Sequence, residues 1–393
     1  MNVLMISDLH THPQNMGNRQ RVYSICMMMK KLGWNIDFLY FGRKKDCDWT
    51  AMRNFFGREN LFFADRGEYT LKSNIKAHFR KKIDAGDISK MFPLKYVEDE
   101  WYCADVDKAI YLLTRKKEYD MVWMPYLFQS RSLELFPHIL KVIESQDRFG
   151  NRDRIFRKLG KKPEFFYTTN DGERKALSRA DVVVTIQKKE EETFKKMLSG
   201  TNTFVCNIGN VIEFRKTRLP KEKNFGFIGT SNGPNLIGFQ WFVEEVLPLV
   251  RAKMPDFNFF VAGALCNKIS DSTEYVKLGY VDSLQDFYDS IRFSIVPMLN
   301  GTGLNIKSIE ALAYSKPLVS TTVGAKGLEN AKEAMLITDS SEKMAERIVE
   351  LLQDDKQCQN MMEAAEQFVR TYNLESEKKL LEIGELAKKR KDK

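Results

Sequence analysis

GTGLNIKSIEALA, residues 301–313, is followed after a short gap by KPLVS, residues 316–320. The first stretch begins with glycines after an apolar strand at 293–299 and continues as a short helix that ends before a second strand. Glycines here let the backbone approach a ligand, and the N–H groups at the start of a helix suit phosphate. Glu310 lies in the first turns of this helix, where its carboxylate can accept the paired hydroxyls of a ribose. The pattern predicts a nucleotide site, and the alternative is an ordinary strand–turn–helix connection with a surface glutamate.

This stretch resembles the donor-binding motif of glycosyltransferases with the two-domain GT-B fold, in the large family that includes sucrose synthases and bacterial mannosyltransferases. That family carries Glu-x7-Glu here, with the second glutamate on the ribose of the donor. Glu310 matches the second glutamate, whereas Thr302 stands at the position of the first. A subgroup has a small residue there, in a Gly-Ser-Gly-Thr-Arg-Leu-Lys-like run. Residues 301–307 resemble that run, with Asn305 in place of arginine. The departure leaves open the contacts to the donor sugar and the stereochemical outcome.

Length and composition indicate a two-domain globular protein. At 393 residues the chain is longer than one hydrophobic core usually supports. A hydrophobic content of 43% and a charged content of 29% are typical of such proteins. No run reaches the roughly 18 apolar residues of a membrane helix, and residues 1–6 indicate a first strand, not a signal peptide. The six cysteines are scattered without a Cys-x-x-Cys, which favours free thiols in a reducing cytoplasm.

The positive charge is concentrated in the first half. Residues 1–205 hold 37 Lys and Arg against 27 Asp and Glu, a net charge of +10, and residues 206–393 hold 25 against 26, a net charge of −1. An anionic partner is therefore expected to dock on the first half. The densest segment, Lys72 to Lys95, interleaves basic and apolar residues. Such a segment can lie on an anionic membrane surface, or it can be a solvated helix face.

Strands and helices alternate along both halves, which predicts two doubly wound α/β domains. In the first half we expect strands at 3–6, 35–41, 119–125, 140–144 and 182–186, and a helix at 188–197. In the second half we expect a strand at 257–262, and helices at 239–254, 343–352, 355–372 and 374–393. We place the first domain at 1–210, the second at 211–372, and a C-terminal helix at 373–393 that packs back on the first domain. Residues 45–110 carry no clear pattern.

Two further segments of the second half resemble the donor side of this family. The loop after the strand at 225–229 offers N–H groups and hydroxyls to a diphosphate, and it opens a helix of the family's Trp-Phe-x4-Leu-Pro type. Many members carry Lys or Arg near this loop; here Asn235 is nearest, and Lys307 is the better-placed cation. The Gly279–Asp282 turn resembles the loop that contacts the base. The resemblance implies donor contacts from Gly229, Thr230, Ser231, Asn235, Tyr280, Val281, Thr302, Gly303, Leu304, Asn305 and Glu310. For the first loop, the alternative is a capped helix start without a ligand.

The first half contributes fewer candidates. Gly17 and Asn18 precede the first helix, where a glycine can approach the phosphate or sugar of the donor, and Arg21 adds positive charge. Asp147 follows the strand at 140–144, in a segment that resembles an Asp-Thr-His-Asp-type element with Gln146 where histidine is common. The alternatives are a solvated arginine in a first turn and an aspartate that caps a helix.

Two possible metal motifs are set aside. The stretch SDLHTH, residues 7–12, looks like the start of a metallophosphoesterase site, but such sites need more His and Asp ligands than this chain offers. Asp46-x-Asp48 and Asp105-x-Asp107 fit the Asp-x-Asp of metal-dependent glycosyltransferases, yet neither follows a convincing strand. We therefore expect no bound metal.

The sequence therefore predicts a GT-B glycosyltransferase that uses a nucleotide-activated sugar, UDP- or GDP-linked, without a cofactor. Lys307, Asp147 and Arg21 are the candidate catalytic residues, and Lys307 and the two loops would stabilise the leaving diphosphate in place of Mg²⁺. The resemblance implies retention of anomeric configuration and an acceptor that is a glycan, a lipid-linked sugar or a protein, as in cell-surface polysaccharide synthesis. We expect no nucleic-acid partner, and a cytoplasmic protein that can contact the inner face of the membrane. The alternatives are a sugar-nucleotide epimerase of the same fold and a catalytically weak binding subunit.

Overall fold

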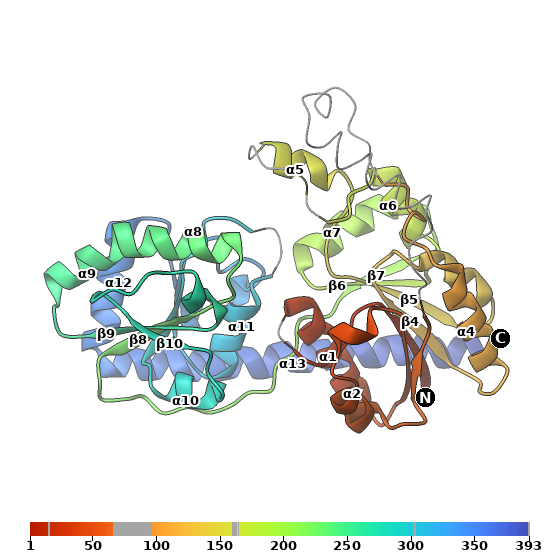
Figure 1. Cartoon of the computed structure of the whole chain (residues 1–393), viewed down its shortest axis with the longest axis horizontal. Coiled ribbons are helices and arrows are strands. Elements are labelled where there is room, and N and C mark those ends of the chain that lie inside the picture. The colour runs from red at the N-terminus through yellow and green to blue at the C-terminus, as the bar shows by residue number, and fades with distance from the viewer. Residues whose placement is uncertain (15, 66–95, 159–162, 164, 302–303, 392–393) are drawn as a thin grey trace. The chain divides into compact units, whose positions relative to one another are not determined.

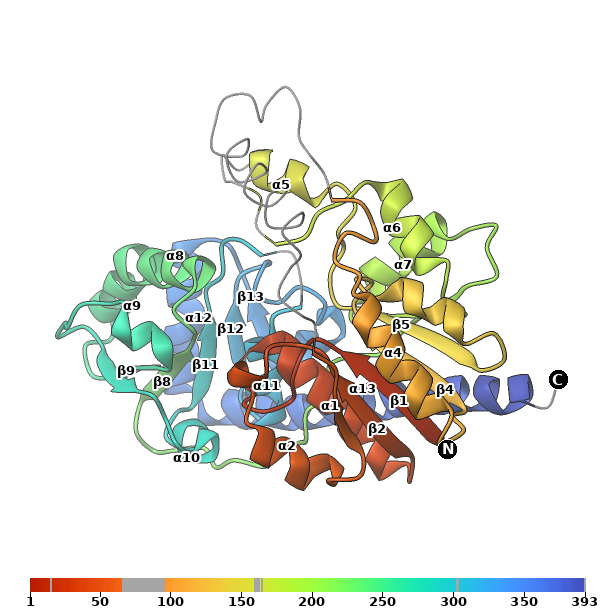
Figure 2. The same cartoon turned by 45° about the vertical axis from the view of Figure 1, so that its right-hand side comes forward.

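The computed structural model describes residues 1–14, 16–65, 96–158, 163, 165–301 and 304–391 (Figure 1). The chain forms two compact units. Unit 1 comprises Met1–Gly209 together with Ser376–Lys393, and unit 2 comprises Asn210–Glu375. Each unit contains one parallel sheet, seven-stranded in unit 1 and six-stranded in unit 2, with helices on the sheet (Figure 2). This is the doubly wound architecture expected from the alternating pattern.

The sheet of unit 1 has the strand order β3-β2-β1-β4-β5-β6-β7. Its strands are β1 (Asn2–Ser7), β2 (Asn35–Tyr40), β3 (Leu61–Phe63), β4 (Met121–Pro125), β5 (Leu140–Ser145), β6 (Val182–Thr185) and β7 (Phe204–Asn207). The central strands are buried almost throughout, as is usual for parallel strands covered on both faces. The expected strand at 119–125 begins two residues later, at Met121, and the hydroxyl of Tyr119 before it donates to Asp37 at 2.7 Å.

The helices of unit 1 follow its strands in the doubly wound manner. They are α1 (Gly17–Lys31), α2 (Trp49–Phe56), α4 (Ala104–Thr114), α5 (Arg152–Lys158), α6 (Asn170–Leu177) and α7 (Lys188–Met197), with 3-10 turns η1 (Lys44–Asp46) and η3 (Ser130–Leu135). The helix predicted at 188–197 is confirmed to the residue. Asp48 caps α2 by accepting from the backbone N–H of Ala51 at 2.9 Å, which explains where that helix begins.

The sheet of unit 2 has the strand order β10-β9-β8-β11-β12-β13. Its strands are β8 (Asn224–Ile228), β9 (Asn258–Ala262), β10 (Val276–Gly279), β11 (Phe293–Val296), β12 (Leu318–Ser320) and β13 (Met335–Ile337). Its helices are α8 (Gly233–Trp241), α9 (Leu247–Lys253), α10 (Leu284–Asp289), α11 (Ile306–Ala313) and α12 (Ser341–Gln353), with 3-10 turns η5 (Ala264–Asn267) and η6 (Glu329–Ala334).

The helix predicted at 239–254 contains a wide turn. A π-helical segment, η4 (Phe242–Val246), joins α8 to α9. Pro248 follows this segment, and a proline lacks the N–H and the space that a regular helical turn needs. The wider turn keeps one continuous helical face on the sheet, where Phe242, Val246 and Leu247 are buried in the core of unit 2.

The C-terminal residues form one helix, α13 (Asp355–Lys391), of 37 residues. The prediction of two helices, 355–372 and 374–393, was wrong. The helix continues through Asn373, whose side-chain amide donates to the carbonyl of Ile212 at 2.8 Å. From Ser376 onward the helix belongs to unit 1. Its last turns lie on that sheet: Arg390 pairs with Asp181 at 2.8 Å and Lys391 with Asp120 at 2.9 Å.

Candidate functional site

Each sheet reverses its strand order at one point, and this locates the candidate sites. In unit 2 the reversal lies between β8 and β11, and in unit 1 it lies between β1 and β4. In doubly wound sheets, ligands bind beyond the carboxyl ends of the strands at such a point. In unit 2 this places the loop after Ile228 and the segment between Val296 and α11 at the candidate site.

The loop between β8 and α8 is held by side-chain amides. Asn232 caps α8, because its Oδ1 accepts from the backbone N–H of Asn235 at 3.0 Å. The Nδ2 of Asn235 in turn donates to the carbonyl and the hydroxyl of Thr230, at 2.8 and 3.0 Å. Thr230 and Ser231 are exposed, whereas Gly229 and Asn235 are buried. The loop thus combines a capped helix start with two exposed hydroxyl side chains.

Lys307, on the first turn of α11, reaches across to this loop. Its ammonium donates to the Oδ1 of Asn235 at 2.7 Å and lies 5.8 Å from the centre of the Phe227 ring. Burial lowers the pKa of Lys307 to about 8, and the negative charge of Glu310 partly opposes this shift. A cation that is costly to bury and has a neutral hydrogen-bond partner is well suited to receive an anion.

Glu310 lies one turn further along α11 and is oriented by a tyrosine. Its Oε1 accepts from the hydroxyl of Tyr288 on α10 at 2.9 Å. Tyr288 is fully buried and stacks on Tyr314 with ring centres 4.5 Å apart. Burial raises the pKa of Glu310, while the Tyr288 hydrogen bond and Lys307 oppose the shift. Sequence reasoning missed Tyr288, because no local pattern relates a tyrosine on α10 to a glutamate 22 residues later.

Four of the remaining predicted donor residues of unit 2 lie in the described part of the chain: Leu304 and Asn305 directly before α11, and Tyr280 and Val281 after β10. Asn305 is the N-cap residue of α11 but makes no side-chain cap, and Leu304 before it is partly buried. Tyr280 follows β10 and is 81% exposed, whereas Val281 packs against the core. The predicted residues Thr302 and Gly303 lie outside the described residues.

In unit 1, the structure assigns Arg21 to the interior. Its side chain is fully buried, and its Nε donates to the Oε1 of Glu144 at 2.6 Å. The Oε2 of Glu144 accepts from the indole of Trp123 at 2.8 Å, and the Arg21 guanidinium also donates to the carbonyl of Gly209. Arg21, which lies on α1, is thus held by β5 and by the segment after β7, while its Nη2 has no hydrogen-bond partner among the described residues. Its catalytic role stays a prediction.

Asp147 and the neighbouring residues follow β5, beyond the carboxyl ends of the strands of the same sheet. Asp147 pairs with Arg152 at 3.2 Å, and burial raises its pKa while Arg152 opposes the shift. Gln146 is 8% exposed, and neither side-chain amide atom has a hydrogen-bond partner among the described residues. An unpaired buried amide is costly, and it marks this end of the strands as a candidate polar site. Gly17 begins α1, and the buried Oδ1 of Asn18 is another atom of unit 1 without a hydrogen-bond partner among the described residues.

Glu173, on α6, was missed by sequence reasoning. Its carboxylate accepts from the backbone N–H groups of Phe149 and Gly150, at 2.7 and 2.9 Å. Burial raises its pKa to about 7, and the two N–H donors oppose the shift. Gly150 is required there, because a Cβ on it would lie 2.6 Å from the Glu173 carboxylate. Glu173 therefore fixes the segment that carries Gln146 and Asp147.

The acidic pairs considered as metal motifs have other partners. Asp46 pairs with Arg43 at 2.6 Å and Asp48 caps α2, while Asp105 pairs with Lys108 at 2.7 Å. Burial, with a smaller effect of Arg19, lowers the pKa of His10 to about 4. Within the described part of the chain, no group of three or more His, Cys, Asp or Glu side chains is placed to hold a metal ion.

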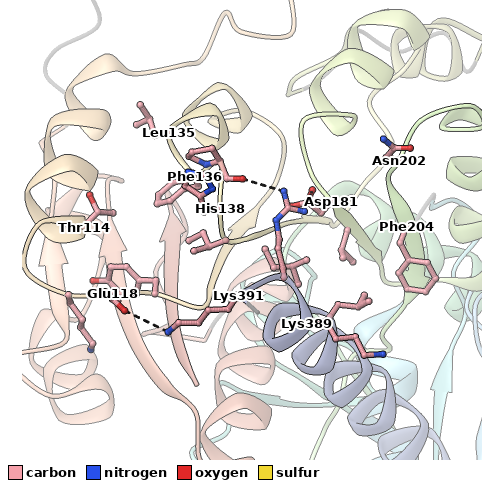
Figure 3. Close-up of a pocket in the computed structure, with 18 residues that line it drawn as sticks. Thr114, Glu118, Leu135, Phe136, His138, Asp181, Asn202, Phe204, Lys389 and Lys391 are labelled. Atoms are coloured by element: carbon pink, nitrogen blue, oxygen red, sulfur yellow. Dashed lines mark hydrogen bonds and ion pairs between the residues drawn. The ribbon is translucent and has the colours of Figure 1, made fainter. Parts of the chain in front are cut away.

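A pocket of about 1310 Å³ lies at the opposite edge of the unit 1 sheet, by the amino ends of β4 to β7 (Figure 3). Its walls include Tyr119, Leu140, Val182 and Phe204 at those amino ends, and residues 386 and 389–391 of α13. Arg390 and Lys391 are neutralised there by acidic partners. This pocket is therefore distinct from the candidate sites beyond the carboxyl ends of the strands, both in its position and because the charges of Arg390 and Lys391 are paired.

Two predictions concern membranes: a basic segment that contacts a membrane surface, and the absence of a membrane-spanning helix. The basic segment Lys72–Lys95 lies outside the described residues. Among the helices in the described ranges, none combines the length and the apolar character needed to span a bilayer.

Comparisons with known proteins agree with this geometry. Residues 222–354 match the family model described as "Glycosyl transferases group 1". A curated relative, an uncharacterized 44.6 kDa protein in the cps region of Klebsiella pneumoniae, is 23% identical over 88% of this chain and 90% of its own length. The sucrose-phosphate synthase of Thermosynechococcus elongatus is similar in structure, with a TM-score of 0.66, 14% identity and 99% of both chains covered. The pneumococcal O-GlcNAc transferase GtfA, solved with UDP and GlcNAc, has a TM-score of 0.68, 10% identity and coverage of 98% and 99%.

Proposed function

We propose that this chain, which has the GT-B fold and matches the glycosyl transferases group 1 model over residues 222–354, is a glycosyltransferase that transfers a sugar from a UDP- or GDP-linked donor to a glycan, lipid-linked or protein acceptor. The observation that carries the proposal is the pair Lys307 and Glu310 on α11. One offers a cation beside the β8–α8 loop and the other a half-buried carboxylate one turn away. A diphosphate would match the cation, and the hydroxyls of a ribose would match the carboxylate.

The proposed reaction draws its catalysis from charge stabilisation. Breaking the bond between sugar and phosphate places negative charge on the leaving diphosphate. Lys307, the exposed hydroxyls of Thr230 and Ser231, and the backbone N–H groups at the start of α11 would stabilise that charge. These groups would replace a metal ion, so the proposed mechanism is metal-independent. Retention of anomeric configuration is proposed from the family resemblance, and the anomeric proton of the product reports it by NMR.

Cell-surface polysaccharide or glycoconjugate synthesis is the proposed setting. It is supported by the similarity to a protein of the cps region of Klebsiella pneumoniae. The acceptor is proposed to bind unit 1, which carries all of the net positive charge and holds the unpaired amide of Gln146 beyond the carboxyl ends of its strands. A cytoplasmic protein that contacts the inner face of the membrane through its basic first half would fit a lipid-linked acceptor.

A panel of UDP- and GDP-sugars tests the proposal. The protein is incubated with each donor in the presence and absence of EDTA, and released nucleotide and transferred or hydrolysed sugar are measured by mass spectrometry. We expect turnover with a restricted set of donors, unchanged by EDTA. Binding by calorimetry without turnover would instead identify a binding subunit, and conversion of the donor into an epimer would identify an epimerase. Strong inhibition by EDTA would contradict the metal-independent mechanism.

Substitution Glu310→Ala is expected to weaken donor binding by about 1.5–3 kcal/mol, because a charge-assisted contact to the ribose is lost. The measurement is calorimetry with the donor that turns over, compared with the 2′-deoxy form of its nucleotide. If Glu310 binds the ribose, the wild-type protein prefers the ribose form and Glu310→Ala loses that preference. An exposed carboxylate of the same unit, Glu346 on α12, provides the control Glu346→Ala. Equal affinity of wild type and Glu310→Ala would reject the ribose contact.

A further inference from the structure

Asn235 links two parts of the unit 2 site that are far apart in sequence. Its side chain is 1% exposed, and both ends of its amide are used. The Oδ1 accepts from the Lys307 ammonium at 2.7 Å, across 72 residues of sequence. The Nδ2 donates to the carbonyl and hydroxyl of Thr230 in the β8–α8 loop. One buried amide therefore connects the cation on α11 to the backbone of the loop.

The chemistry of this amide suits an anion site better than that of any other residue of similar size. An aspartate in its place would neutralise Lys307, and it would face the Thr230 carbonyl with an acceptor instead of a donor. An aliphatic residue would leave a partly buried ammonium without a partner, which favours its neutral form. Asparagine holds the ammonium in place and leaves its positive charge available to an incoming ligand.

We propose that Asn235 is a positioning residue that fixes the Lys307 ammonium to the β8–α8 loop, so that cation and loop form one preassembled site for the diphosphate of the donor. The inference rests on the proposed function and refines it, because it assigns to Asn235 a role through Lys307 instead of a direct contact. A preassembled site loses little conformational freedom when the anion arrives, and it is already aligned when charge develops on the leaving group.

The charged surroundings of Lys307 give the proposal a measurable consequence. Among the described residues, the groups that face it are Glu310 on its own helix, Asn235 on α8, and the ring of Phe227 on β8, while Tyr288 on α10 bonds to Glu310. Glu310 is the one charged group among them. A change at position 235 should therefore move the pKa of Lys307, whose value of about 8 makes it titrate within an accessible pH range.

The experiment compares Asn235→Asp with Asn235→Leu and follows the Lys307 amine directly by NMR of labelled lysine across pH. The new carboxylate of Asn235→Asp should raise the pKa by about one unit or more, whereas Asn235→Leu should lower it. The control Asn258→Asp adds the same charge at the amino end of β9, whereas the site lies beyond the carboxyl ends of the strands. This control should leave the pKa of Lys307 unchanged. Both variants should keep the wild-type melting temperature. If Asn235 only filled space in the core, the two substitutions would not shift the pKa of Lys307 in opposite directions.

The second measurement is the affinity for UDP and for GDP by calorimetry between pH 6 and 9.5. Wild-type affinity should fall as pH rises through the Lys307 pKa, since the ammonium is lost. In Asn235→Asp, the affinity for the nucleotide at pH 7 should be lower by about tenfold or more. The decrease of affinity with rising pH should occur at a higher pH than in the wild type. An unchanged Lys307 pKa in both variants overturns the inference, even if donor turnover shows that the proposed function holds. Binding of neither nucleotide by the wild type, together with no turnover, refutes the proposed function and this inference with it.

Discussion

Replacing Lys307 with alanine is expected to lower kcat by about 10²- to 10³-fold, equivalent to roughly 2.7–4 kcal/mol of transition-state stabilisation. The intact donor carries less negative charge on its diphosphate than the leaving group does, so the ammonium binds the transition state more strongly than the substrate. Affinity for the donor should therefore change less than kcat. Affinity for the free nucleoside diphosphate, which resembles the leaving group, should change more than affinity for the donor.

Steady-state kinetics with the best donor of the panel, together with calorimetry for donor and nucleotide, measure both quantities. Lys343, an exposed lysine on α12, supplies the matched control Lys343→Ala, which should behave as wild type. The sign of the pH dependence follows from the pKa of about 8: the active ammonium form is complete below this pH, and kcat/KM should fall as pH rises through it. An increase in KM with kcat unchanged would reduce Lys307 to a ground-state binding residue.

Replacing Arg21 with methionine is expected to destabilise unit 1 by about 3–5 kcal/mol, because it leaves the fully buried carboxylate of Glu144 without its cation. Among the described residues, the carboxylate would retain only the Trp123 indole as a side-chain hydrogen-bond partner, and the Gly209 carbonyl would lose its guanidinium donor. A buried charge without a counter-charge is one of the few ways in which a single substitution lowers the free energy of unfolding by this much.

Urea unfolding followed by tryptophan fluorescence measures this loss, since four of the five tryptophans, at positions 34, 49, 101 and 123, belong to unit 1. The double variant Arg21→Met with Glu144→Gln should recover part of the stability, because the amide can still pair with Trp123 without a buried charge. Arg43→Met removes an exposed arginine from an ion pair with Asp46 and should cost about 1 kcal/mol or less. A loss no larger than that of Arg43→Met would show that the buried pair is not needed for folding.

Local patterns predicted the elements and part of the site. The buried strands of both sheets were found because an apolar run covered on two faces is visible in a few consecutive residues. Lys307 and Glu310 were found for a related reason: they lie three residues apart on one short helix, so helical spacing alone places them one turn from each other. The glycines before that helix and the asparagine cap of α8 are equally local signals.

Long-range pairing could not be predicted in this way. Nothing near Arg21 indicates that its partner is Glu144, 123 residues away, or that its side chain is fully buried. The helix predicted to end before Asn373 continues through it, and the side chain of that residue bonds to a carbonyl 161 residues earlier in the chain, a contact that no local pattern indicates.

The sequence by itself thus determined two parallel α/β sheets, the loops at the carboxyl ends of their strands, and an acid and a base on one helix. The tertiary structure alone decided which charges are buried and what each polar side chain bonds to. It brought Asn235 to Lys307, Tyr288 to Glu310 and Glu173 to the segment after β5. The physical reason is that secondary structure depends on neighbours within about one turn, whereas desolvation and hydrogen bonding depend on whichever distant segments the fold packs around a side chain.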